Sequence, residues 1–382
     1  MRTAISYVRT LIVISYLQYI KAFSISEVTS TIPDAVLYPF GFATAFRAGA
    51  AISVTNHPKV SPLDTKVGSK VLRLPSSGAR LRLFYPTKDT SKSTAPYLTN
   101  GRQTSNAMAA RVGFEQLGLS FLLAHLATAS SGCVQDAPIS TYKLPLLVYS
   151  HGYGGNMDMS TYLFREMASK GMIIAAVEHT DGTASSTILK DGRERRFNEY
   201  LYTGRQQLIK RSTELLEAVE YLPNELEMKY GVDVDTIMLG GHSYGCPSAI
   251  MAANGASEGT NVDGLLLHDP ALGMGYGMLP PNGAISKIRT ITYVSDEYNR
   301  ANVRYGSLTL HIKGCKHGNF VDAPLWAPIF IMRLLSVLIP AAGSSDPVVI
   351  HKELAESTSA FMICKDPMSA NVAKGRLFER VR

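Results

Sequence analysis

One short motif carries the residue types of nucleophilic catalysis. Gly241-His242-Ser243-Tyr244-Gly245 has the form G-x-S-x-G. The apolar and β-branched run Val234–Leu239 before it predicts a buried strand, and Pro247–Ala253 after it can start and continue a helix. A serine between a strand and a helix is typical of a nucleophile elbow, in which glycines are needed because the two elements approach too closely for a Cβ. Ser243 is therefore the candidate nucleophile.

A serine hydroxyl needs a base to take its proton, and in an α/β-hydrolase the order along the chain is serine, acid, histidine. Four histidines follow the motif: His268, His311, His317 and His351. His317 lies in a loop after the strand-like segment Ser307–Ile312, where such a sheet presents its chemistry. His311 falls within that strand and is expected to be packed or at the surface, and His351 begins an amphipathic stretch expected at the surface. His317 is the candidate base.

Two carboxylates are candidates for the acid that orients the base. Asp269 follows the short apolar strand Gly264–His268, and Asp296 follows the next strand, Ile291–Val294. The commonest α/β-hydrolase layout favours the later position, whereas Asp296 also fits a solvated turn. The spacing alone leaves Asp269 and Asp296 equal.

Several segments resemble motifs of the plasma-type and intracellular type II platelet-activating factor acetylhydrolases, a family of the α/β-hydrolase superfamily. Leu146–Gly154 resembles that family's strand ending in S-H-G-x-G, and Ala168–His179 resembles its A-S-x-G-[FY]-x-V-A-A-V-E-H segment, continued by Thr180–Ser185. His317–Asp322 resembles its H-x-N-F-x-D motif. The motifs keep the family's order and span roughly residues 68 to 361.

The resemblance implies roles for individual residues. Ser243 matches the family's nucleophile, His317 its base, and Asp269 its acid, so the resemblance favours Asp269 over the runner-up. The backbone N–H groups of Tyr153 and Tyr244 match the two donors of the oxyanion hole.

The resemblance also implies an activity. A member of this family is expected to be a serine-dependent, metal-independent esterase, without a cofactor, that hydrolyses the sn-2 acyl ester of short-chain or oxidised glycerophospholipids. Cys246 replaces a common glycine, and Pro270–Gly275 replaces an aromatic-rich stretch beside the acyl pocket, so acyl preference stays open. The alternatives are a carboxylesterase, thioesterase or dienelactone-type hydrolase of soluble esters, and a non-catalytic lipid-binding protein on a hydrolase scaffold.

Length and composition suit one large enzyme domain. The chain has 382 residues, 46% of them hydrophobic, and a net charge of +7. Basic clusters such as Arg193–Arg196 are interrupted by acids and lack interleaved aromatics, which excludes nucleic acid as an expected partner. The cysteines have no metal-ligand spacing. We expect a monomer.

Hydropathy divides the chain into four parts. Residues 1–24 combine a basic start with the apolar run Leu11–Ile20 and predict a signal peptide or signal anchor, with an amphipathic start as the alternative. This favours a secreted or endomembrane location over a cytoplasmic or membrane-associated one. Residues 25–67 are expected to form an irregular lead-in, 68–365 the catalytic domain, and 366–382 a polar tail.

The domain is expected to have an α/β fold. Val71–Leu74 and Arg80–Tyr85 alternate as antiparallel strands should, and strands then recur at 146–150, 172–177, 234–240, 263–268, 289–294 and 307–312 with helices such as 205–222 between them. This predicts a mostly parallel central sheet with antiparallel N-terminal strands and helices on both faces.

Two apolar helical stretches lie outside the catalytic skeleton, Phe114–Leu126 and Leu325–Ile339. Apolar helix faces of this kind are ordinarily buried against the sheet. The family resemblance, however, places lipid-surface helices here, which makes Leu122, Trp326 and Leu334 candidates for contact with a membrane or lipoprotein surface.

Overall fold

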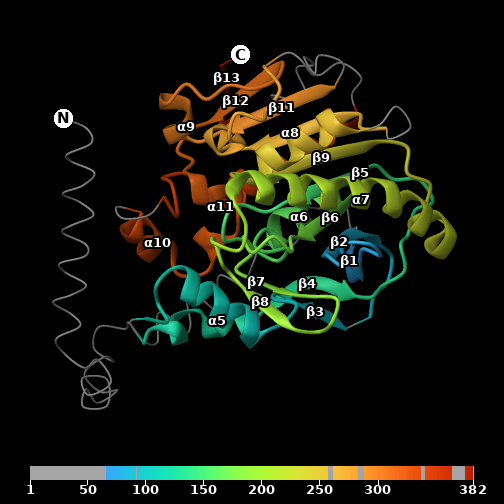
Figure 1. Cartoon of the computed structure of the whole chain (residues 1–382), viewed down its shortest axis with the longest axis horizontal. Coiled ribbons are helices and arrows are strands. Elements are labelled where there is room, and N and C mark those ends of the chain that lie inside the picture. The colour runs from blue at the N-terminus through green and yellow to red at the C-terminus, as the bar shows by residue number, and fades with distance from the viewer. Residues whose placement is uncertain are drawn as a thin grey trace.

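The computed structural model describes residues 66–381 except 92, 117, 257–260, 283–287, 337–339 and 364–374. The predicted signal segment and nearly all of the lead-in lie outside the described residues. Within them, a single large twisted sheet is covered by helices on both faces (Figure 1). No helix of this described part is long and apolar enough to cross a membrane.

The sheet has eleven strands in the order β13-β12-β11-β10-β9-β5-β6-β2-β1-β4-β3, and a separate hairpin joins β7 to β8. The strands are β1 (Lys66–Arg73), β2 (Arg80–Thr87), β3 (Thr94–Pro96), β4 (Ser130–Gln135), β5 (Leu146–Ser150), β6 (Ile173–Glu178), β7 (Ser186–Ile188), β8 (Glu194–Arg196), β9 (Ile237–His242), β10 (Gly264–His268), β11 (Arg289–Val294), β12 (Leu308–Ile312) and β13 (Phe378–Arg380). Strands β6, β5, β9, β10, β11 and β12 run parallel, so their carboxyl ends meet along one edge.

The helices form two layers around this sheet. They are α5 (Arg102–Arg111), α6 (Thr161–Ser169), α7 (Gly204–Tyr230), α8 (Gly245–Gly255), α9 (Asp296–Arg300), α10 (Ile329–Leu335) and α11 (Pro347–Ile363), with short 3₁₀ helices η1 (Ser120–Ala127), η2 (Leu272–Gly275), η3 (His317–Phe320) and η4 (Ala323–Leu325). Helices α7 and α8 contribute to the core on one face, and α6 and α11 to the core on the other.

The alternation of side chains along the parallel strands explains the two cores. In β5, Leu146 and Val148 face the α7/α8 core, whereas Leu147 and Tyr149 face the α6/α11 core. Because successive side chains of a strand point to opposite faces, a strand covered on both sides must be apolar throughout. All five residues of β5 are accordingly buried.

The predicted α/β fold, with parallel central strands and antiparallel N-terminal strands, is confirmed. The sequence did not indicate β3, β4 or the β7/β8 hairpin. The short strand β13 lies inside the segment expected to be a polar tail, and it pairs antiparallel with β12 at one edge of the sheet.

The surface position expected for His351 is wrong. His351 lies in α11, which packs against α6, and its imidazole is fully buried with Nε2 bonded to Asn319 O (3.1 Å). Burial lowers the pKa of His351 to about 4, so the ring is neutral.

Candidate active site

The G-x-S-x-G motif forms the tight turn between β9 and α8. Ser243 adopts a left-handed backbone conformation (φ 56°), which is strained for a residue with a Cβ. A Cβ on Gly241 would overlap the backbone of Gly245, and a Cβ on Gly245 would overlap the carbonyl of Ser150. The glycines therefore permit the close approach, and the turn presents Ser243 at the wall of a pocket.

Asp269 and His317 meet at the carboxyl edge of the sheet. His317 Nδ1 lies 2.7 Å from Asp269 Oδ2, and the other carboxylate oxygen accepts the backbone N–H of Ser295 (2.8 Å). Asp269 is fully buried. Since an ionised carboxylate can only accept, this bond places the proton on Nδ1 and leaves the Nε2 lone pair available toward the pocket that Ser243 also lines.

Asp296, the runner-up acid, has a different partner. It begins α9, and its Oδ1 lies 2.8 Å from His311 Nε2 and accepts the backbone N–H of Gly314 (3.2 Å). His311 is nearly buried in β12, consistent with the packed role expected for it. Of the two candidate carboxylates, Asp269 is thus the one that contacts His317.

Two aromatic rings pack against the His317 imidazole, and neither contact was predicted from the sequence. Tyr298 stacks on one side, with ring centroids 5.2 Å apart and planes 11° apart, and His242 lies 4.4 Å away by centroid. His242 Nε2 also contacts His317 O (3.1 Å). Burial, followed by the neighbouring His317, holds the pKa of His242 well below its usual value, so His242 packs as a neutral ring.

The loop after β5 carries the expected oxyanion donors. Gly154 N donates to Thr183 O (2.8 Å) and Gly155 N to Gly152 O (3.0 Å), which fixes the turn around Tyr153. Within the described residues no hydrogen bond uses the N–H of Tyr153 or of Tyr244. Both groups are therefore free to donate to a substrate oxygen.

A buried arginine contacts the backbone of this loop, which is called the oxyanion loop below after the role expected for it. Arg211 Nη1 donates to His151 O (2.8 Å) and Nη2 lies 3.5 Å from Gly152 O, while the guanidinium lies 4.7 Å from the centroid of the Tyr244 ring. Its charge is matched by Asp181 (3.1 Å). One side chain of α7 thereby touches the residues around both expected donors.

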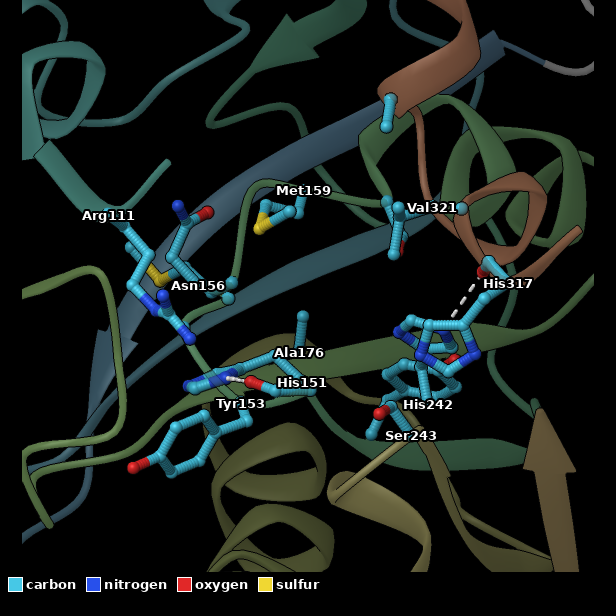
Figure 2. Close-up of a pocket in the computed structure, with 18 of the residues that line it drawn as sticks. Arg111, His151, Tyr153, Asn156, Met159, Ala176, His242, Ser243, His317 and Val321 are labelled. Carbon is cyan, nitrogen blue, oxygen red and sulfur yellow. Dashed lines mark hydrogen bonds between the residues drawn. The ribbon is translucent and has the colours of Figure 1, made fainter. Parts of the chain in front are cut away.

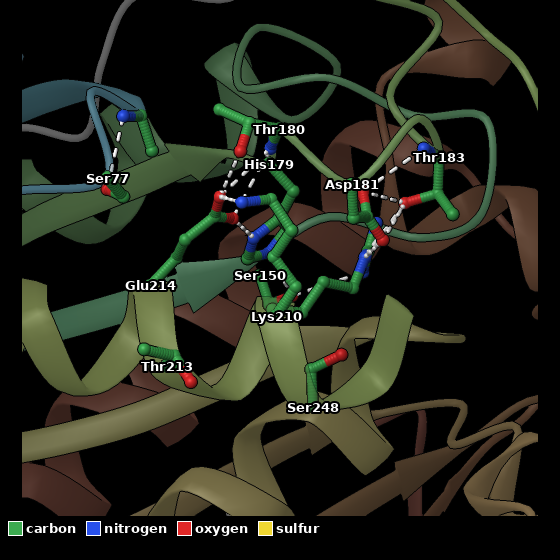
Figure 3. Close-up of polar contacts among 12 residues, drawn as sticks. Ser77, Ser150, His179, Thr180, Asp181, Thr183, Lys210, Thr213, Glu214 and Ser248 are labelled. Atoms are coloured by element: carbon green, nitrogen blue, oxygen red, sulfur yellow. Dashed lines mark hydrogen bonds and ion pairs between the residues drawn. The ribbon is translucent and has the colours of Figure 1, made fainter. Parts of the chain in front are cut away.

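A second set of polar contacts continues from this arginine (Figure 3). His179 Nε2 lies 2.7 Å from Ser150 Oγ, and His179 Nδ1 lies 2.8 Å from Glu214 Oε2. Glu214 also accepts the hydroxyl of Thr180. The network ties the ends of β5 and β6 to α7, which is the part of the fold that carries the oxyanion loop.

Burial sets the charge state of these inner groups. It lowers the pKa of five neutral histidines, namely His151, His179, His242, His268 and His351. It raises the pKa of two carboxyl groups, Glu214 and Asp322, to about 7. Asp322 accepts from Tyr97 Oη (3.1 Å) and from the backbone N–H of Tyr162 (3.0 Å).

The pocket itself is mostly apolar and has a volume of about 430 Å³ (Figure 2). Its apolar wall includes Tyr149, Met157, Phe164, Ala176, Val321, Trp326 and Ala341. Ser243, His317 and Tyr153 line it together with Arg111 and Asn156. An apolar pocket with a few convergent polar groups is the usual form of a small-molecule site.

The candidate lipid-surface residues lie in different environments. Trp326 is only 8% exposed, and its Nε1 donates to Tyr97 Oη (2.8 Å). It is therefore buried, as is ordinary for such apolar stretches, and the alternative of a lipid-surface position is wrong for this residue. Leu122 is half-buried, whereas Leu334 in α10 is 70% exposed. Phe121 and Phe330, in the same two stretches, are 61% and 62% exposed.

Comparison with known proteins gives a family match. A family model described as platelet-activating factor acetylhydrolase, isoform II, matches residues 59–224. Over this part of its length the chain is similar to the platelet-activating factor acetylhydrolases. The enzyme of that name from Canis lupus familiaris is 25% identical over 214 residues, covering 46% of this chain and 47% of the relative. The one from Cavia porcellus is 24% identical over 329 residues, covering 74% and 71%.

The similarity to these acetylhydrolases covers only part of each protein. The Bos taurus acetylhydrolase is 27% identical over 207 residues, 46% of each chain, so the chain spans about half the length of the first curated relatives it matches. A solved structure of a ferulic acid esterase from Streptomyces cinnamoneus superposes with a TM-score of 0.59 at 18% identity, covering 85% of this chain and 97% of that one. This likeness identifies the fold as that of an α/β-hydrolase.

Proposed function

We propose that the chain is a serine-dependent carboxylic ester hydrolase that removes a short or oxidised sn-2 acyl group from glycerophospholipids. The observation that carries the proposal is the buried Asp269–His317 hydrogen bond beside Ser243 on its strained elbow, in one apolar pocket. The relationship to the acetylhydrolases supports the phospholipid as substrate.

In the first half of the reaction, His317 Nε2 takes the proton of Ser243 Oγ as the oxygen attacks the ester carbonyl carbon. The carbonyl oxygen gains the negative charge and accepts the N–H groups of Tyr153 and Tyr244. Each such donor contributes roughly 2.7–4 kcal/mol to lowering the barrier. Asp269 stabilises the imidazolium, which then protonates the departing glycerol oxygen.

In the second half, a water molecule takes the place of the alcohol. His317 removes a proton from the water as its oxygen attacks the acyl-enzyme carbonyl, and the same proton returns to Ser243 Oγ when the carboxylic acid leaves. Neither half requires a metal ion.

Hydrolysis of a phospholipid with an sn-2 acetyl group, in excess chelator, tests this proposal. The wild-type protein is compared with Ser243→Ala. Turnover that survives chelation and is lost in the variant supports a metal-independent serine phospholipid esterase. Turnover restricted to simple soluble esters discards the phospholipid assignment, and no turnover on either class favours a lipid-binding protein.

We propose that the protein docks on a lipid surface and takes its substrate from there. The exposed apolar residues Phe121, Phe330 and Leu334 belong to η1 and α10, and η1 is joined to the segment before α10 by a contact between His125 Nε2 and Trp326 O (2.8 Å). Leu334→Glu with Phe121→Glu is expected to reduce partitioning onto phosphatidylcholine vesicles. Unchanged partitioning of the folded variant would contradict surface docking.

A further inference from the structure

One permanently charged side chain lines the candidate active-site pocket. Among the described residues that form its wall, Arg111 is the only arginine or lysine, and none is aspartate or glutamate. Two of the three histidines there, His151 and His242, are buried and neutral. Figure 2 shows Arg111 on the opposite side of the pocket from Ser243 and His317, with its guanidinium end directed inward.

Local packing holds the Arg111 side chain in this position. Its guanidinium lies 4.4 Å from the centroid of the Phe197 ring and 5.6 Å from that of Tyr153, distances at which a cation is attracted to an aromatic face. The side chain also runs over Gly154, where a Cβ would lie 2.5 Å from Arg111 Nε. The oxyanion loop thus leaves room for the arginine.

The charge of Arg111 has no protein counterpart in the described part of the chain. No carboxylate there lies within ion-pair distance of the guanidinium, and no hydrogen bond uses the guanidinium N–H groups. The two nearby acids have other partners, since Glu115 pairs with Arg196 (3.2 Å) and Glu199 accepts from Tyr153 Oη (3.3 Å). Aromatic contacts occupy the faces of a guanidinium and leave its edge free to donate.

We propose that Arg111 binds an oxyanion carried by the substrate, at the end of the pocket away from Ser243. The inference rests on the proposed ester hydrolysis and adds to it that Arg111 is the residue that recognises an anionic group at a distance from the scissile ester. A guanidinium edge matches both a carboxylate and a phosphate with two parallel hydrogen bonds. The anion is therefore either a carboxylate at the end of the acyl chain or the phosphate of the alcohol part.

Four water-soluble esters, each used below its micellar concentration, distinguish these sources. The acyl group is pentanoyl or glutaryl, which differ by a terminal carboxylate. The alcohol is the 1,3-dimethyl ether of glycerol or 1-O-methyl-glycero-3-phosphocholine, which differ by the phosphate-bearing head group. The wild-type protein is compared with Arg111→Met, Arg111→Lys and the control Arg102→Met, at the exposed other end of the same helix α5.

The expected result is a change in substrate preference. Arg111→Met lowers the ratio of kcat/KM for an ester that carries the carboxylate or the phosphate over the ester that carries neither. The expected change is about tenfold, because charge-assisted hydrogen bonds at an exposed site are partly screened. Arg111→Lys retains part of the preference, and Arg102→Met retains all of it. If the preference is lost only for the two glutaryl esters, Arg111 binds the carboxylate of the acyl chain. If it is lost only for the two phosphocholine esters, Arg111 binds the phosphate of the head group.

Other outcomes overturn the inference. Equal loss of kcat/KM on all four esters would mean that Arg111 supports the Tyr153 loop and binds no anion. Unchanged kcat/KM on all four esters would mean that it does neither. Wild-type turnover with either result leaves the proposed ester hydrolysis intact. Absence of wild-type turnover on all four esters would remove the proposed function and the inference with it.

Discussion

Replacement of Asp269 by asparagine should abolish turnover through the tautomer of His317. Asp269 accepts two hydrogen bonds, one from the Ser295 backbone and one from His317 Nδ1. An asparagine has one acceptor oxygen and one NH₂ group, so it can satisfy only one of these donors. The buried Ser295 N–H is fixed by the backbone and takes the oxygen. The NH₂ group then faces His317 Nδ1.

The imidazole must now accept at Nδ1, and its proton moves to Nε2, where the lone pair for Ser243 is required. In serine hydrolases the equivalent exchange lowers kcat by about 10⁴-fold, which corresponds to about 5 kcal/mol of barrier. We expect a loss of this size for Asp269→Asn in hydrolysis of a soluble short-chain ester. The matched variant is Asp296→Asn, whose carboxylate contacts His311 and the Gly314 N–H. It should keep kcat within a few-fold of the wild type.

Both variants must melt near the wild-type temperature for the comparison to hold. Near-normal turnover of Asp269→Asn, or an equal loss in Asp296→Asn, would refute the assignment of Asp269 as the group that orients the base.

Three further predictions concern the supports of the site. Arg211→Met should lower kcat by up to about 10²-fold, because the oxyanion loop loses its support. It should also lower the free energy of unfolding by about 3–5 kcal/mol, because the buried Asp181 carboxylate is left without its charge partner. Unchanged kcat in a destabilised protein would contradict the positioning role. Gly245→Ala should prevent folding or abolish turnover, because its Cβ overlaps the carbonyl at the end of β5, whereas Gly255→Ala at the end of α8 meets only ordinary contacts and should be active. Stability in urea should fall as pH decreases below about 6.5, because the five neutral histidines take up protons only on unfolding. The buried carboxyl groups of Glu214 and Asp322 have the opposite effect. Because their pKa is raised in the folded state, they stabilise it at low pH, and this stabilisation is lost as pH rises through about 7. The buried histidines outnumber these carboxyl groups, so the net effect is a loss of stability on acidification. Stability that increases on acidification would contradict this reasoning.

The sequence predicted the parts of the site that depend on local chain geometry. A strand, two glycines and a helix predict an elbow because the steric requirement comes from the backbone itself. Ser243 could therefore be predicted as its nucleophile without knowledge of the residues around it. His317 was predicted as the base because loops after parallel strands gather at one edge. The parallel strands were found because burial on both faces requires continuous apolar runs.

What the sequence could not decide were the directions of side chains. Asp269 and Asp296 follow neighbouring parallel strands, and the hydrogen bonds of the folded chain show which one faces His317. Asp269 contacts His317, whereas Asp296 contacts His311. Trp326 was a candidate for contact with a lipid surface, but a hydrogen bond to the buried Tyr97 hydroxyl holds it inside. Arg211 gave no signal, since a charge on an amphipathic helix is ordinarily solvated.

The short strand β13 has a consequence for the solubility of the protein. Strand β12 is an apolar, β-branched segment, Leu308–Ile312, and its free side would otherwise present a row of unpaired backbone groups to other molecules. Phe378–Arg380 covers this side and exposes charged side chains in its place. The opposite border of the sheet ends in the three-residue strand β3, which contains Pro96 and offers little to pair with. Shortening the chain before Gly375 would uncover β12 and favour strand addition between copies, so a fusion partner or a protease that disturbs this end would promote aggregation while the pocket is still intact.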